Sequence, residues 1–147
     1  MFEKLFQLIK DNAEKAVINN PKIAEKHLES IVTEASSTII DVLKNNIETG
    51  RMKDLVAFFQ VKGIYNNPLV NSMVNKFANR LNKYYDLSPN AAYKISEELI
   101  PTVMVQLVQQ TKNEKSKEFS LGAMFSKLNG NRTDLSGLVN GMMLAAS

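Results

Sequence analysis

The sequence contains no cysteine and a single histidine, His27. Without cysteine the chain has no disulfide, no thiolate zinc ligand, no cysteine nucleophile and no redox pair, which fits a reducing compartment. A Ser/His/Asp catalytic site would depend on His27, and no nucleophile-elbow spacing accompanies it. We therefore interpret His27 as a surface or half-buried helix residue.

Excess charge and long hydrophobic runs are also scarce. The formal net charge is +3 over 147 residues, which falls short of the concentrated basic patch of a dedicated DNA-binding protein. Uncharged runs such as Leu99 to Thr111 are shorter than the roughly 20 apolar residues that a membrane-spanning helix needs. The first residues lack the apolar core of a secretory signal. We expect a soluble cytoplasmic protein.

Motifs that carry chemistry are missing as well. The sequence has no Gly-rich phosphate loop, no EF-hand spacing and no His-Glu zinc helix. The adjacent acids Glu97 and Glu98 point to different faces of a helix and do not form a carboxylate pair. We therefore expect a protein that is not an enzyme, with no cofactor, no metal site and no small-molecule substrate.

The clearest pattern is a long helix from Ser88 to Thr111. Ser88 is a good N-cap, and Pro89 follows at the first helical position, where its missing N–H costs nothing. Apolar residues then recur at spacings of three and four, which places them on one face: Ala92, Ile95, Leu99, Val103 and Leu107. Pro101 lies inside this pattern and predicts a kink.

Similar spacing predicts the other helices. They cover 2–17, 21–47, a short segment around 55–59, 68–85, a short segment 121–128 that Ser120 caps, and a weak C-terminal helix at 134–145. The residues between 60 and 66 and between 112 and 118 are predicted to be loops.

The two halves of the sequence resemble each other. With a shift of 64 residues Ile39 aligns with Val103, and with a shift of 66 Phe59 aligns with Phe125. A three-helix unit of this size buries too little surface alone, so the halves are expected to share one core. We predict an all-α single domain, 1–147, that forms a compact six- to seven-helix globule from two similar three-helix halves, 1–66 and 67–128, with pseudo-twofold symmetry.

The second half also resembles a known family. The run Leu99 to Leu107, followed by a polar loop, Ser120-Leu121-Gly122 and the tail 137–141, is similar to the YidB-like family over about residues 68–147. The resemblance implies a bacterial, non-enzymatic, all-helical protein of unassigned function. The family offers no catalytic or binding residues to carry over.

One candidate binding site is the basic face of the helix 68–85. Lys76, Arg80 and Lys83 are spaced four and three apart and form a stripe that could neutralise phosphates. The alternative is an ordinary solvated helix face. The stripe predicts weak nucleic-acid binding at most.

The other candidate is a protein interface in the C-terminal segment. Its apolar stripe consists of Leu135, Leu138, Val139, Met142 and Met143. This stripe either covers the core or docks a second subunit or another protein. The leading hypothesis is therefore a non-catalytic interaction or assembly protein that self-associates or binds a protein partner through apolar terminal helices.

Overall fold

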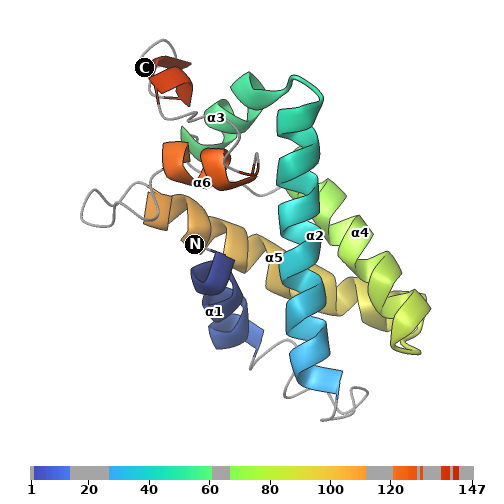
Figure 1. The fold of residues 1–147 in the computed structure, drawn as a ribbon. Helices are drawn as coiled ribbons and strands as arrows, with labels where there is room; N and C mark the ends of the chain where they lie inside the picture. The colour runs from blue at the N-terminus through green and yellow to red at the C-terminus, as the bar shows by residue number, and fades with distance from the viewer. Residues whose placement is uncertain are drawn as a thin grey trace.

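The computed structural model describes residues 2–13, 27–60, 67–111, 121–128, 130, 137–139 and 141–142. All regular elements among these residues are helices: α1 (Phe2–Ala13), α2 (Leu28–Glu48), α3 (Met52–Gln60), α4 (Pro68–Tyr84), α5 (Pro89–Thr111) and α6 (Leu121–Leu128) (Figure 1). Residues 137–139 and 141–142 are helical too. The all-α prediction is confirmed for this part of the chain. The predicted helix ends at Val17 and Pro21 and the predicted loop 112–118 lie outside it. Of the predicted loop 60–66, Gln60 is instead the last residue of α3, and the rest lies outside the described residues.

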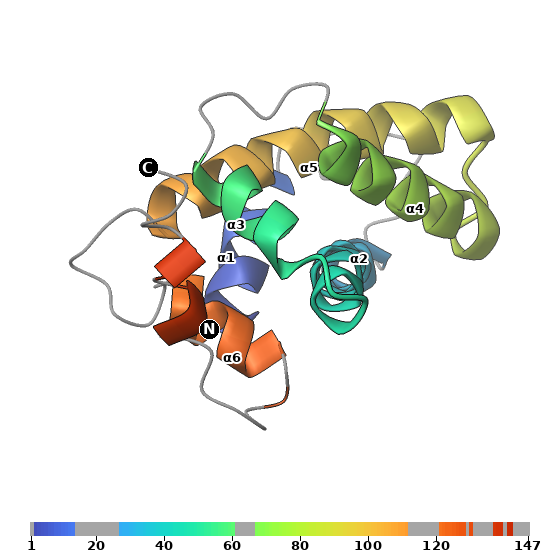
Figure 2. The same ribbon diagram turned by 90° about the horizontal axis from the view of Figure 1, so that it is seen from above.

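The core is built on the two long helices, α2 and α5. Helix α2 packs against α1, α3, α4 and α6, and helix α5 packs against α1, α3 and α4 (Figures 1 and 2). The apolar faces predicted from helical spacing supply the buried side chains, among them Ile31, Ile39, Leu43, Ile95, Leu99 and Val103. Helix propensity alone seldom stabilises helices of this length in water, so burial of these faces holds them in place.

Two polar contacts fix the outer helices on the long ones. The side-chain amides of Asn12 in α1 and Gln106 in α5 exchange hydrogen bonds of 2.9 and 3.1 Å. Arg80 in α4 reaches across to α2. Each contact joins segments far apart in sequence, so it sets how the helices lie against one another.

Helix α2 ends in a Schellman motif. The amide of Arg51 donates to the carbonyl of Asn46 at 2.7 Å, and the amide of Gly50 donates to the carbonyl of Ile47 at 3.3 Å. Gly50 has a φ of +79°, a conformation that costs little without a Cβ. The motif turns the chain sharply into α3 and leaves Arg51 at the start of that helix.

Helices α4 and α5 are capped at their N-termini by the residues that the sequence predicts. The side chain of Asn67 accepts from the amide of Leu69 at 2.9 Å, and Pro68 is the first helical residue. Ser88 accepts from the amide of Ala91 through its hydroxyl at 3.2 Å. In the connecting turn Asp86 has a φ of 55°, which Asp tolerates better than most residues.

Helix α5 continues without interruption through Pro101. The predicted kink there stays a prediction. Within the described residues, every helix is too short or too polar to cross a lipid bilayer.

Candidate functional site

The C-terminal residues divide into a buried side and an exposed side. Val139 is fully buried, and Met142 packs against the core while staying partly accessible. Leu138 has 52% of its surface exposed. Leu135 and Met143, the other predicted interface residues, lie outside the described residues. The segment therefore covers the core through Val139 and presents Leu138 to solvent, and docking of a partner stays a prediction.

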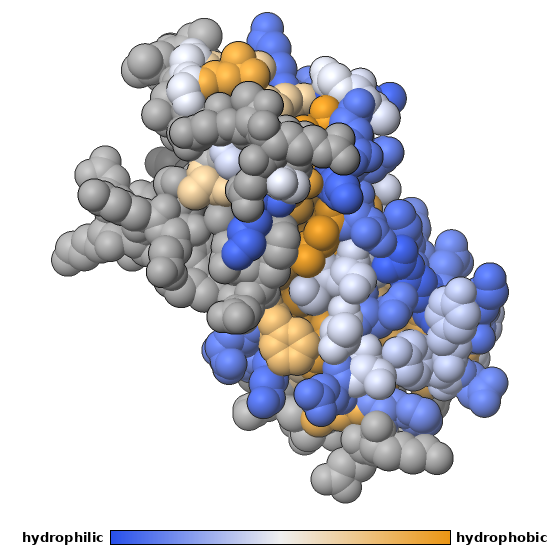
Figure 3. All heavy atoms as spheres, viewed as in Figure 1, coloured by the Kyte–Doolittle hydropathy of each residue, from blue (hydrophilic) through white to orange (hydrophobic). Residues whose placement is uncertain are grey.

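Leu138 borders a hollow against helix α3. The hollow measures about 510 Å³ and is lined by Lys53, Val56, Ala57, Gly137, Leu138, Gly141 and Met142, which we call the α3–tail surface. Among the described residues, no atom outside the adjoining backbone lies within 4 Å of where a Cβ would stand on Gly137 or Gly141. Figure 3 shows hydrophobic atoms reaching the surface near the C-terminal segment. The lining is mainly apolar, which favours an apolar occupant.

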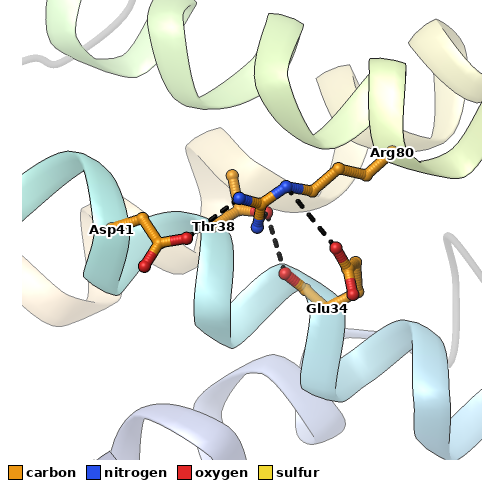
Figure 4. Close-up of polar contacts among 4 residues, drawn as sticks. All are labelled: Glu34, Thr38, Asp41 and Arg80. Atoms are coloured by element: carbon orange, nitrogen blue, oxygen red, sulfur yellow. Dashed lines mark hydrogen bonds and ion pairs between the residues drawn. The ribbon is translucent and has the colours of Figure 1, made fainter.

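The predicted basic stripe on α4 is not a uniform cationic face. Arg80 turns toward α2, where its Nη1 donates to the Thr38 hydroxyl and its Nη2 to the Asp41 carboxylate, both at 2.9 Å (Figure 4). Its Nε lies 3.5 Å from the Glu34 carboxylate. Only 22% of the Arg80 side chain is exposed. Two carboxylates already neutralise Arg80, which makes it a poor phosphate ligand.

The other two cations of the stripe are exposed and in different surroundings. Lys83 places its Nζ 5.4 Å from the ring centroid of Tyr84. Lys76 borders a groove formed with α2 and α3. Lys76, Arg80 and Lys83 thus have different neighbours along α4, and phosphate binding by them stays a prediction.

His27 lies directly before α2 and contacts the turn between α4 and α5. Its ring meets Tyr85 edge to face, with centroids 5.8 Å apart. Burial raises the pKa of the Tyr85 hydroxyl, the nearby Glu34 carboxylate raises it further, and a hydrogen bond with Ser30 lowers it. These groups tie the turn after α4 to the first turns of α2.

A second depression, the mixed-charge groove, has no counterpart in the sequence predictions. It measures about 820 Å³ and lies between the second half of α2, helix α3 and the first turns of α4. Its charged lining residues are Asp41, Lys44, Glu48, Arg51, Asp54 and Lys76. Arg51 precedes α3 and Lys76 lies in α4, 25 positions later, so sequence spacing carries no signal that they line one groove.

Among the described residues, no three or more His, Asp or Glu side chains converge as a metal site would require. Searches against protein families, curated proteins and solved structures found no match to this chain.

Proposed function

We propose that this is a non-catalytic assembly protein that self-associates through the α3–tail surface. The observation that carries the proposal is the half-exposed Leu138 beside an apolar hollow of about 510 Å³. In a twofold dimer the same patch faces itself, so it must hold both a projecting group and a space to receive one. The α3–tail surface has both.

The energetics favour Leu138 as the anchor. Burying a fully exposed leucine side chain contributes about 1.5–3 kcal/mol, so covering the exposed half of Leu138 contributes about half of that, and a twofold contact counts it twice. Gly137 and Gly141 let a partner backbone approach closely, because they carry no side chain and none of the described residues packs over them. Lys53 at the rim can extend its aliphatic stem over the contact while its ammonium stays in water.

Light scattering on the full chain tests the proposal. Wild type is expected to show a mass that rises toward that of a dimer with concentration, and Leu138→Glu is expected to stay monomeric. The matched control is Tyr93→Glu, because Tyr93 on α5 is also exposed, at 47%, but does not line the α3–tail surface. A monomeric wild type, or a dimer that Leu138→Glu leaves intact, would refute the proposal.

We also infer that the chain arose from two similar three-helix halves. In this repeat α1, α2 and α3 correspond to α4, α5 and α6. In support, α1 packs on α5 and its counterpart α4 packs on α2. Likewise α3 packs on α5 and its counterpart α6 packs on α2. The matched residues Ile39 and Val103 are both fully buried. A pseudo-twofold axis relates elements by this kind of reciprocal exchange. The resemblance to the YidB-like family stays a prediction.

The second candidate function is weak nucleic-acid binding through α4. The observation in its favour is Lys83 beside the ring of Tyr84, a residue that is 63% exposed and could offer its ring for a base to stack on. Retention on single-stranded DNA at about 50 mM salt, lost in Lys83→Glu, would support it. Absence of retention at that salt concentration would exclude it.

A further inference from the structure

The mixed-charge groove is open on one side and walled by three helices. Its lining comes from one face of α2 (Asp41, Lys44, Asn45, Glu48), one face of α3 (Arg51, Asp54, Phe58) and the start of α4 (Pro68, Ser72, Lys76). Figure 2 looks down on these segments, with α2 seen end-on beside α3 and α4. The face of α3 used here differs from the one in the α3–tail surface, although Ala57 borders both.

Some charged residues of the groove form ion pairs and others do not. Asp41 is held by Arg80 at 2.9 Å, and Lys44 lies 3.9 Å from Glu48. Within residues 27–60 and 67–111, Arg51 and Lys76 have no acid within ion-pair distance, and both are exposed. They lie on separate walls of the same depression. Within the described residues, Arg51, Lys76 and the acid Asp54 therefore line a common space without an ion-pair partner.

We infer that the mixed-charge groove binds an acidic polypeptide segment. The Arg51 guanidinium suits a carboxylate, because its planar donors match the two carboxylate oxygens. The Lys76 ammonium provides a second positive charge on the opposite wall. The exposed Pro68 and half-buried Leu69 add apolar surface for a neighbouring side chain of the segment.

The acids of the groove select the class of partner. Glu48 and Asp54 are exposed carboxylates of the lining, so a nucleic-acid backbone would bring its repeated phosphates against them. A peptide can place its own acids beside Arg51 and Lys76 and neutral side chains beside the lining acids. The inference is independent of self-association, because it uses other residues.

Fluorescence anisotropy with the full chain tests the inference. The probe is a labelled peptide of Glu, Leu and Ala, and the comparison probe has Gln in place of every Glu. The Glu peptide is expected to bind more tightly, with affinity that falls as salt is raised. The double variant Arg51→Glu/Lys76→Glu is expected to bind the Glu peptide roughly tenfold more weakly.

A matched control separates the groove from the overall charge. Lys83→Glu/Lys94→Glu changes the net charge by the same amount at exposed positions outside the groove, and it is expected to leave binding unchanged. If Arg51→Glu/Lys76→Glu lowers the helicity of the chain, the double variant Arg51→Gln/Lys76→Gln is used in its place. Equal binding of both peptides, an equal loss in the control, or equal competition by inorganic phosphate or a single-stranded oligonucleotide would overturn the inference.

Discussion

The rings of Phe59 and Phe125 meet edge to face, with centroids 6.1 Å apart. Both side chains are fully enclosed, and they come from α3 and α6, which align with each other in the proposed repeat. Equivalent residues of two related units touch only close to the axis that relates the units. The pair therefore marks where the two proposed halves meet.

Truncating this pair is expected to weaken the fold strongly. Phe125→Ala should lower the free energy of unfolding by about 3–5 kcal/mol, because it leaves a cavity in the core. A double-mutant cycle of Phe59→Leu and Phe125→Leu, followed by urea denaturation, should give a coupling of about 0.5–1.5 kcal/mol. The control cycle joins Phe59→Leu with Phe77→Leu in α4. Additive effects in the first cycle would show that the ring contact contributes nothing of its own.

Arg80 is expected to stabilise the packing of α4 on α2. Arg80→Ala removes three polar contacts and leaves Glu34 and Asp41 without their cation. We expect the free energy of unfolding to fall by about 1–2 kcal/mol. The loss is modest because the side chains of Arg80, Glu34 and Asp41 are partly exposed to solvent. Lys83→Ala on the same helix should change it by less than about 0.5 kcal/mol. Arg80→Lys should not restore stability, because an ammonium cannot bond to all three groups in the same geometry. Equal effects of the alanine variants in urea denaturation would contradict this role.

Helical spacing predicted many of the buried apolar residues, because a face of buried side chains repeats every three to four residues, but Ile100 and Met104 are buried as well and were not in the predicted face. Ile39 and Val103 are buried as that spacing requires. The direction of Arg80 could not be predicted in this way. Periodicity places it at the border of a face, but whether it meets solvent or a neighbouring helix depends on how α4 and α2 are rotated against each other.

The candidate sites show the same limit. The apolar stripe that includes Leu138 and Val139 was visible in the sequence, yet the division between a buried Val139 and an exposed Leu138 depends on what α3 supplies opposite them. The mixed-charge groove was missed because its walls come from three helices, and no short motif relates Arg51 to Lys76.

Stability is expected to fall in alkaline solution through Tyr85. Its pKa is raised in the folded state, mainly by burial and then by Glu34, above the usual value of about 10. The folded chain therefore holds this proton more tightly than the unfolded chain does. The resulting stabilisation is complete below pH 10 and is lost as pH rises through the folded-state pKa.

Denaturation series across this pH range measure the free energy of unfolding, which should decline less in Tyr85→Phe than in wild type. Tyr93→Phe, at an exposed site, should behave as wild type. Parallel declines in all three proteins would contradict the assignment.

Self-association through the α3–tail surface can be measured directly as a distance between two copies. Since the chain has no cysteine, Lys53→Cys carries the only thiol and takes one spin label at the rim of the hollow. Pulsed electron spin resonance is expected to give a defined, short distance between labels at position 53, which disappears when Leu138→Glu is added. Labels at Asn90→Cys, at the start of α5 and far from residues 137–142 in Figure 1, should give a longer distance. A signal at position 53 no different from that of isolated molecules, or a shorter distance at position 90, would contradict the proposed assembly.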